Sequence, residues 1–240
     1  MMCRRVAARY QASMTKAIVI GASGGIGSAL ADALEARGGS VVRLSRRSDP
    51  PLDLDDDGSI EAAAAALAER APFDLILIAT GLLHGPRVSP EKSYRQIDGS
   101  ALDRLFRVNA TGPALVMRHF LPLLARDRRS VMVALSARVG SIGDNRLGGW
   151  VGYRSAKAAL NQIIRTLAIE LARSHPNTIL AGLHPGTVDT GLSAPFQRNV
   201  AADKLFTPEE SAAHLLEVID GLVPADSGGC FDFGGKPIAP

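Results

Sequence analysis

The sequence is poor in the residues that mark several protein classes. It has two cysteines among 240 residues, and these, Cys3 and Cys230, lie near opposite ends without metal-ligand spacing. They indicate neither a disulfide framework nor a metal site, and they fit a reducing compartment. No apolar run approaches the ~18 residues of a membrane span. We therefore expect a cytoplasmic protein with no metal and no membrane segment.

A strong charge bias and an internal linker are also missing. The net charge is +3, and acidic and basic residues are interspersed, so nucleic-acid binding is not indicated. No Pro-, Ser- or Gly-rich stretch divides the chain, and we expect one domain over residues 14–240. Residues 1–13 are Arg- and Ala-rich, lack acids and lack the apolar core of a secretory signal. We expect them to be a disordered extension, with a transit peptide as the alternative.

Short apolar runs alternate with helical patterns along the rest of the chain. A strand at 16–20, a glycine-rich turn, a helix to about Arg37 and a strand at 41–44 make one strand–helix–strand unit. Further strands are expected at 50–53, 74–78, 130–135, 177–183 and 228–233, and helices at 60–70, 101–125 (interrupted near 109–113, where Gly and Pro disturb the helical ladder), 153–173 and 208–222, with a polar loop at 191–206 as a candidate lid. The third of those helices carries the residue Tyr153, and the last has Thr207 as its N-cap. This order predicts an α/β fold with a Rossmann-type doubly wound parallel sheet of about seven strands, helices on both faces, and ligands at the carboxyl ends of the strands.

The turn after the first strand has the composition of a phosphate site. Gly21, Gly25 and Gly27 permit a tight turn and close backbone approach, and the following helix offers free N–H groups at its positive end. Between a strand and a helix this pattern predicts dinucleotide binding. The alternative is a loop used only for tight packing.

The turn after the second strand is basic. Ser45, Arg46 and Arg47 stand where a carboxylate would bind the ribose hydroxyls of NAD, and arginines there suit a 2′-phosphate. The pattern favours NADP(H), with NAD(H) as the alternative cofactor. An ordinary solvated basic turn is the other interpretation.

The chemistry-bearing pair is Tyr153 and Lys157. On a helix, residues four apart share a face, so the ammonium is expected to favour the phenolate and lower its pKa. Ser136, at the end of the apolar run 131–135, could hold a carbonyl oxygen for protonation by the phenol. Surface helices also place Tyr and Lys at this spacing, and that is the alternative.

Taken together, these motifs resemble those of the short-chain dehydrogenase/reductases from about residue 15 to the C-terminus. The resemblance implies a catalytic tetrad of Asn109, Ser136, Tyr153 and Lys157, with Asn109 in a water-mediated proton relay. It implies these cofactor contacts: Gly21, Ser23, Gly25, Ile26 and Gly27; Arg46 and Arg47; Asp53 and Leu54; Ala79 and Gly81; Asn109, Tyr153 and Lys157; Pro185, Gly186, Val188 and Thr190. The segments around Ser136 and Pro185 resemble the group that contains C-factor and sniffer-type carbonyl reductases.

Two positions depart from the family pattern. Ile20 replaces a threonine before the first glycine, and Ile78-Ala79-Thr80-Gly81 replaces Asn-Asn-Ala-Gly. The missing asparagine puts the stability of the sheet in doubt. The implied function is hydride transfer between NADP(H) and a small carbonyl or alcohol substrate, by a homo-oligomer (a dimer or tetramer). The alternative is a dinucleotide-binding signalling or sensor protein of C-factor type with little turnover.

Overall fold

Six parallel strands form the central sheet of the computed structural model, which describes residues 15–240 without the side chains of Asn199 and Ala202. In chain order the strands are β1 (Lys16–Ile20), β2 (Ser40–Leu44), β3 (Leu75–Ile78), β4 (Ser130–Leu135), β5 (Thr178–His184) and β8 (Cys230–Asp232). Their order across the sheet is β2-β1-β3-β4-β5-β8. β2 lies on one side of β1 and all later strands lie on the other, so the strand order reverses between β1 and β3. In such a sheet ligands bind where the strand order reverses, at the carboxyl ends of the strands.

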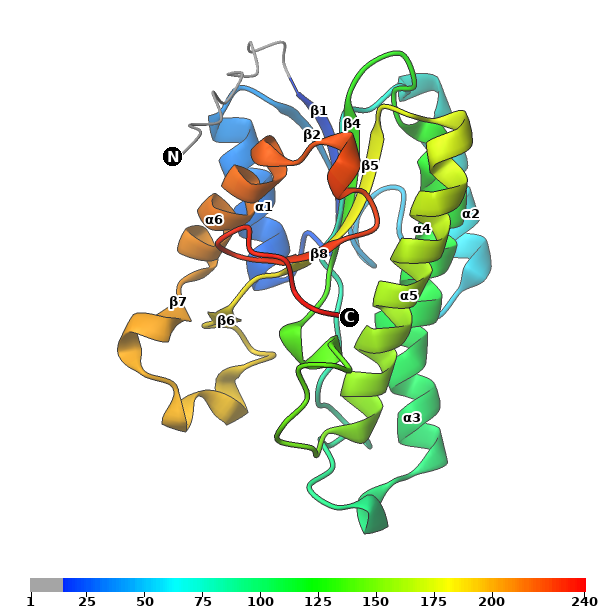
Figure 1. Ribbon diagram of the computed structural model, residues 1–240. Helices are drawn as coiled ribbons and strands as arrows, with labels where there is room; N and C mark the ends of the chain where they lie inside the picture. Colours follow the sequence, from blue (N-terminus) through cyan, green and yellow to red (C-terminus); the bar gives the residue numbers. More distant parts are fainter. Residues whose placement is uncertain (1–14) are drawn as a thin grey trace, which may run out of the picture.

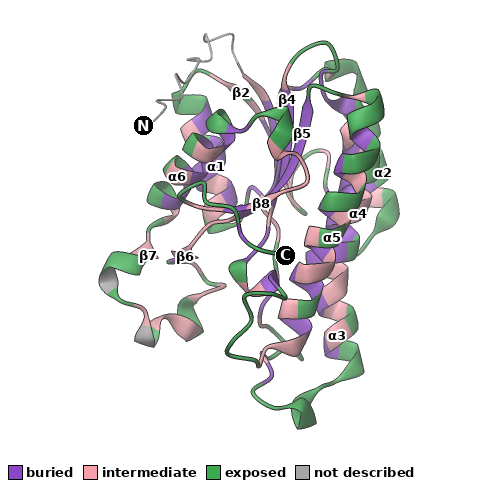
Figure 2. Ribbon diagram, in the orientation of Figure 1, coloured by how far each residue is buried: buried purple, intermediate pink, exposed green. Residues whose placement is uncertain are grey.

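Helices cover both faces of the sheet (Figure 1). Helices α1 (Gly25–Ala36) and α6 (Pro208–Gly221) pack on one face, and α2 (Asp57–Ala66), α4 (Gly112–Phe120) and α5 (Val151–Ser174) on the other. Helix α3 (Gly99–Phe106) precedes α4 and packs on the first half of α5. The central strands β1, β3, β4 and β5 are almost continuously buried (Figure 2). Their alternate side chains enter the two core clusters because successive residues of a strand point to opposite faces. The predicted fold class is confirmed.

Two local predictions about helices are confirmed. The helix expected over 101–125 is interrupted, because Arg107–Thr111 forms a π-helical segment between α3 and α4. The segment contains Asn109, and such bulges often mark functional sites. Thr207 caps α6, since its hydroxyl accepts from the backbone N–H of Glu210 while the Glu210 carboxylate accepts from that of Thr207.

The strand predicted at 50–53 does not form, so the sheet has six strands where about seven were expected. Prolines at 50 and 51 supply no N–H groups to a ladder. Serines fix this segment: Ser48 Oγ donates to the carbonyl of Pro50 over 2.8 Å, and Ser59 Oγ accepts from the N–H of Asp53 over 2.9 Å. The segment nonetheless reaches the carboxyl edge of the sheet, where Leu52 is 3% exposed.

The stretch 191–206, expected to be a loop and a candidate lid, has some structure. It contains the 3₁₀ turns Ala194–Asn199 and Ala202–Lys204, and its last residues form β7 (Leu205–Phe206), which pairs with β6 (Thr187–Val188). The predicted disordered extension at 1–13 lies outside the described residues. Within 15–240, no helix is long and apolar enough to cross a membrane.

Candidate active site

The turn between β1 and α1 has the geometry of a phosphate cradle. Gly21 has a φ of +88°, a conformation that favours glycine. A Cβ at Gly27 would lie 2.2 Å from the carbonyl oxygen of Gly21, so the first turn of the helix can approach the loop only without a side chain. No side chain caps α1, and its first turn has no acid. The free N–H groups and the positive end of the helix dipole therefore suit an anion.

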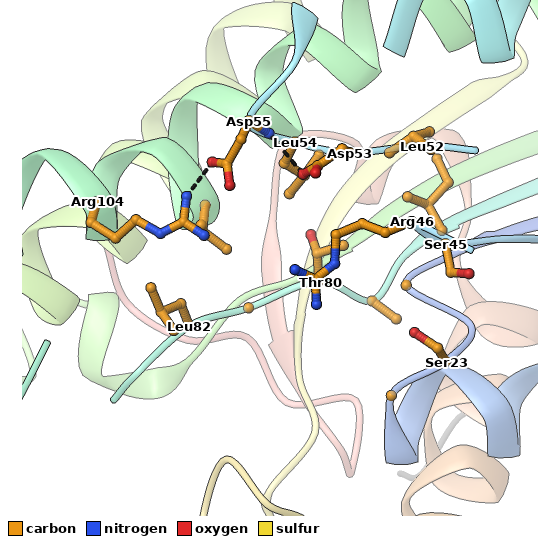
Figure 3. A pocket seen from close by; sticks show the side chains of 16 residues that line it. Ser23, Ser45, Arg46, Leu52, Asp53, Leu54, Asp55, Thr80, Leu82 and Arg104 are labelled. Carbon is orange, nitrogen blue, oxygen red and sulfur yellow. Dashed lines mark hydrogen bonds and ion pairs between the residues drawn. The ribbon is translucent and has the colours of Figure 1, made fainter. Parts of the chain in front are cut away.

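A cavity of about 270 Å³ opens beside this turn (Figure 3). Its lining comes from the ends of β1, β2 and β3, from the segment after Pro51, and from α3 and the π segment. Of the predicted cofactor contacts, it contains Gly21, Ser23, Arg46, Asp53, Leu54, Ala79 and Gly81. Seven of the predicted cofactor contacts therefore line one continuous cavity at the carboxyl edge of the sheet.

The basic turn after β2 forms one end of this region. Ser23, Ser45 and Arg46 line both this cavity and a neighbouring one, which Arg47 completes. The second lining contains two guanidinium groups and two hydroxyls and no carboxylate, which is the donor set that a phosphate monoester prefers. Of the residues present, Arg46 is best placed for a 2′-phosphate, because it belongs to both cavities.

Several lining residues were not predicted. Thr80 lines the cavity, and its hydroxyl oxygen is buried without a hydrogen-bond partner. Asp55 and Arg104 form an ion pair at its rim (Figure 3). Arg104 comes from α3, 49 residues after Asp55, and no local motif could have shown that the two meet. Thr80 could have been recognised, since it follows Ala79 directly at the carboxyl end of β3.

The predicted segment 185–190 reaches the same turn from the other side. A Cβ at Gly25 would lie 2.8 Å from Cγ2 of Thr190, so Thr190 lies against the N-terminus of α1. Gly186 has a φ of +81°, and a Cβ there would meet the ring of Phe206 at 2.7 Å. Ser211 on α6 fixes the segment by donating to the carbonyl of Pro185 over 3.0 Å.

Tyr153 and Lys157 lie at the start of α5 and are both buried. Lys157 Nζ lies 5.8 Å from the centroid of the Tyr153 ring and donates to the carbonyl of Leu135 over 2.8 Å. Burial raises the pKa of Tyr153 to about 12 and lowers that of Lys157 to about 8. The expected lowering of the tyrosine pKa by the ammonium is therefore not found in the protein alone, because desolvation disfavours both charged forms.

Asn109 ties the π segment to the loop after β3. Its Nδ2 donates to the carbonyls of Leu82 and Leu105 over 2.8 and 3.0 Å, and its Oδ1 accepts from the N–H of Leu82 over 3.1 Å. Both amide hydrogens are thus used within the chain, which leaves one acceptor position on Oδ1. In this arrangement the side chain orders the wall between the cavity and Tyr153.

The remaining predicted catalytic residue, Ser136, points elsewhere. Its hydroxyl donates to Oδ1 of Asn161 on α5 over 2.6 Å. In the described part of the chain, neither Ser136 nor any other residue forms a hydrogen bond with the hydroxyl of Tyr153. The neighbour of Ser136, Ala137, belongs to the apolar cluster that contains Tyr153.

An apolar wall surrounds Tyr153. The Trp150 ring lies 6.4 Å from the Tyr153 ring and 5.0 Å from that of Phe196, measured between centroids. Leu192 and Phe196, from the predicted lid, pack against the Tyr153 cluster, as does Leu82, which also lines the dinucleotide cavity. The described residues contain no group of His, Cys, Asp and Glu that could hold a metal ion. Tyr153 and Lys157 are thus buried under an apolar cover, and Leu82 joins that cover to the cavity beside the glycine turn.

Comparisons with known proteins agree with this arrangement. The family model for short chain dehydrogenases matches residues 15–201. The 1-hydroxy-2-glutathionyl-2-methyl-3-butene dehydrogenase of Rhodococcus sp. (strain AD45) is 30% identical over 227 residues, which cover 90% of this chain and 95% of that protein. C-signal of Myxococcus xanthus is 34% identical over 142 residues, which cover 59% of this chain and 80% of that protein.

Two solved structures have the same fold. The NADPH-bound carbonyl reductase from chicken fatty liver has a TM-score of 0.81 at 24% identity and covers 95% of this chain and 99% of its own. The carbonyl reductase Sniffer of D. melanogaster has a TM-score of 0.80 at 19% identity and covers 95% and 100%. At these identities the likeness concerns the fold alone. The family match, the 30% identical dehydrogenase, the glycine turn and the Tyr153–Lys157 pair lead to one conclusion: the chain belongs to the short-chain dehydrogenase/reductase family.

Proposed function

We propose that this protein is an NADPH-dependent reductase of aldehydes or ketones. The observation that carries the proposal is the position of Tyr153 and Lys157. They share the buried start of α5, and Leu82 connects the Tyr153 cluster to the dinucleotide cavity at the carboxyl edge of the sheet. A phenol beside a nicotinamide site is suited to proton transfer at a carbonyl oxygen.

When bound, a reduced nicotinamide supplies a hydride to the carbonyl carbon. Tyr153 donates its phenolic proton to the carbonyl oxygen, so that carbonyl, NADPH and one proton give alcohol and NADP⁺. Lys157, held by the carbonyl of Leu135, places its ammonium beside the phenol and opposes the rise in the tyrosine pKa when charged. Asn109 keeps the loop after β3 in place, and its free Oδ1 position suits a water that returns the proton.

The preference for NADPH rests on the basic turn. Arg46 and Arg47 offer two charged donors where NAD would need an acceptor for its ribose hydroxyls. The chicken carbonyl reductase of the same fold holds NADPH. The cradle at Gly21 and the contacts at Pro185, Gly186, Val188 and Thr190 would hold the pyrophosphate and the nicotinamide.

The decisive experiment is a panel of aldehydes and ketones assayed with NADPH, with Tyr153→Phe as the test variant. The variant should lose reduction almost completely and keep its affinity for NADPH, because only the hydroxyl is removed. Tyr94→Phe is a matched control, since Tyr94 is 73% exposed and distant in sequence. Reduction by Tyr153→Phe at more than a small fraction of the wild-type rate would exclude the tyrosine as the acid.

The alternative function is dinucleotide binding without turnover, in a signalling or sensor role. The similarity to C-signal keeps it under consideration. Tight NADPH binding together with no reduction across the whole panel would favour it over the reductase.

Three further proposals concern the whole protein. We expect a homo-oligomer, a dimer or tetramer, because small residues such as Ala158 and Ala159 on α5 permit close helix approach. We expect a cytoplasmic location, because the cysteine usage fits a reducing compartment. The domain is expected to comprise residues 14–240, with 1–13 as an extension outside it.

A further inference from the structure

The hydroxyl of Ser136 belongs to the interface between β4 and the middle of α5. Its acceptor, Asn161, lies eight residues after Tyr153, which is about 12 Å farther along the helix axis. A Cβ at Gly182 would touch Ser136 Cβ at 3.4 Å, Ile164 Cδ1 at 3.4 Å and Cys230 Sγ at 3.3 Å, so these groups meet over β5. The Ser136 side chain is therefore held by Asn161, which lies two helical turns from Tyr153.

The next residue points the other way. Ala137 has extended backbone angles, φ −150° and ψ 145°, and successive residues of an extended chain face opposite sides. Since Ser136 faces Asn161, Ala137 faces the other side, where it is 8% exposed and packs in the cluster with Tyr153 and Leu105. The side chain after β4 that faces the phenol is therefore the methyl group of Ala137, which forms no hydrogen bond.

We infer that Ala137, and not Ser136, faces the substrate carbonyl, so that Tyr153 orients and protonates it without a second hydroxyl. The inference rests on the proposed function and concerns the same site. Ser136 is a structural residue that ties β4 to α5. A hydroxyl placed on Ala137 would add a donor at the oxygen on which negative charge develops during hydride transfer. One such donor is typically worth about 10²–10³ in kcat.

The test compares Ala137→Ser with Ala137→Cys, which has nearly the same shape but is a weak donor. With the best substrate of the panel, Ala137→Ser should raise kcat by about ten- to a hundredfold and leave the KM for NADPH unchanged, because the new bond forms in the transition state. Ala137→Cys should give no gain. Ser136→Ala should change kcat less than about threefold and lower the melting temperature, since it leaves Asn161 without its donor.

A fall in kcat of a hundredfold or more in Ser136→Ala, with normal melting and NADPH binding, would overturn the inference. An unchanged kcat in Ala137→Ser would overturn it too. If the wild type reduces nothing but Ala137→Ser does, the proposed function fails and the inference stands.

If no variant turns over, melting temperatures decide. Ser136→Ala and Asn161→Leu should lower the melting temperature less than additively in the double variant, because both remove the same hydrogen bond. Ser136→Ala and Tyr153→Phe should be additive. Additivity in the first pair would refute the placement of Ser136.

Discussion

At the scale of single residues, Arg46 is the residue to which we assign the proposed preference for NADPH. It lines both the dinucleotide cavity and the basic cavity beside it. Arg46→Ala should raise the KM for NADPH about ten- to a hundredfold and barely alter that for NADH, because one charge-assisted contact is worth about 1.5–3 kcal/mol. Steady-state kinetics with both cofactors checks this, and the preference should shrink as salt rises. Equal use of the two cofactors by the wild type would return Arg46 to the role of a solvated residue.

Lys157 predicts a pH dependence of stability. Burial lowers its pKa to about 8, from an ordinary value of 10.5. Between these values the unfolded chain holds a proton that the folded protein has released, so the stability contributed by this group rises with pH. Between pH 7.5 and 9.5, the free energy of urea unfolding of the wild type should therefore rise relative to that of Lys157→Met, by on the order of 1 kcal/mol. The comparison with the variant matters because the raised pKa values of Cys230 and Tyr153 act in the opposite direction above about pH 9. A difference that does not change with pH would show that the buried lysine stays charged up to pH 9.5.

At the scale of secondary-structure elements, the start of α5, which carries Tyr153 and Lys157, depends on a distant loop. Helix α5 begins after Trp150, which has a φ of 54° and gives no side-chain cap. Glu91 replaces the cap: its carboxylate oxygens accept from the N–H of Gly152 over 3.2 and 3.3 Å, and its carbonyl accepts from that of Trp150 over 2.6 Å. Because Gly152 directly precedes Tyr153, this contact fixes the backbone position from which the Tyr153 side chain extends.

Glu91→Ala should lower the free energy of unfolding by about 1–3 kcal/mol, because it leaves a buried N–H without its acceptor. It should also lower kcat more than the affinity for NADPH. Glu91→Gln keeps an oxygen acceptor and should retain most of both. Glu69→Ala, at an exposed position of a 3₁₀ turn, is the control. If Glu91→Ala unfolds at the same urea concentration as Glu69→Ala, the capping role is wrong.

The missing asparagine at Ile78-Ala79-Thr80 put the stability of the sheet in doubt, but backbone hydrogen bonds join β3 to β1 and β4 without it. β3 keeps its register with β1 and β4, and the N–H of Ala79 donates to the carbonyl of Ile20 over 2.8 Å. Ile78 itself is 1% exposed and packs in the core. Apolar burial therefore stabilises this position in place of a side-chain hydrogen bond.

At the scale of the whole molecule, β1 is the first element of the described residues and a central strand of the sheet. The N–H of Lys16 donates to the Asp74 carboxylate over 2.9 Å, and the strand pairs with β2 and β3 on its two sides. Removal of residues 1–13 should therefore leave the melting temperature and turnover nearly unchanged, as measured by thermal denaturation and the NADPH assay. Removal of residues 1–18, which cuts into β1, should abolish folding. A large fall in melting temperature after the shorter deletion would show that the extension packs on the domain.

Local sequence determined the fold class, most element positions, the glycine cradle and the helical spacing of Tyr153 and Lys157. These follow from short-range rules: apolar periodicity, glycine conformation and the turn of a helix. The prolines at 50 and 51 also indicated that residues 50–53 would not form a seventh strand.

Only the tertiary structure decided which hydroxyl faces which partner. Whether Ser136 or Ala137 points to the phenol depends on where β4 ends and on the packing of α5, and a shift of one residue in an extended chain reverses every side chain. The same holds for the pKa of Tyr153, because burial by Trp150 and its neighbours from three loops outweighs the lysine one turn away. The sequence places the reactive groups along the chain; their solvent exposure and their partners arise from contacts between residues far apart in it.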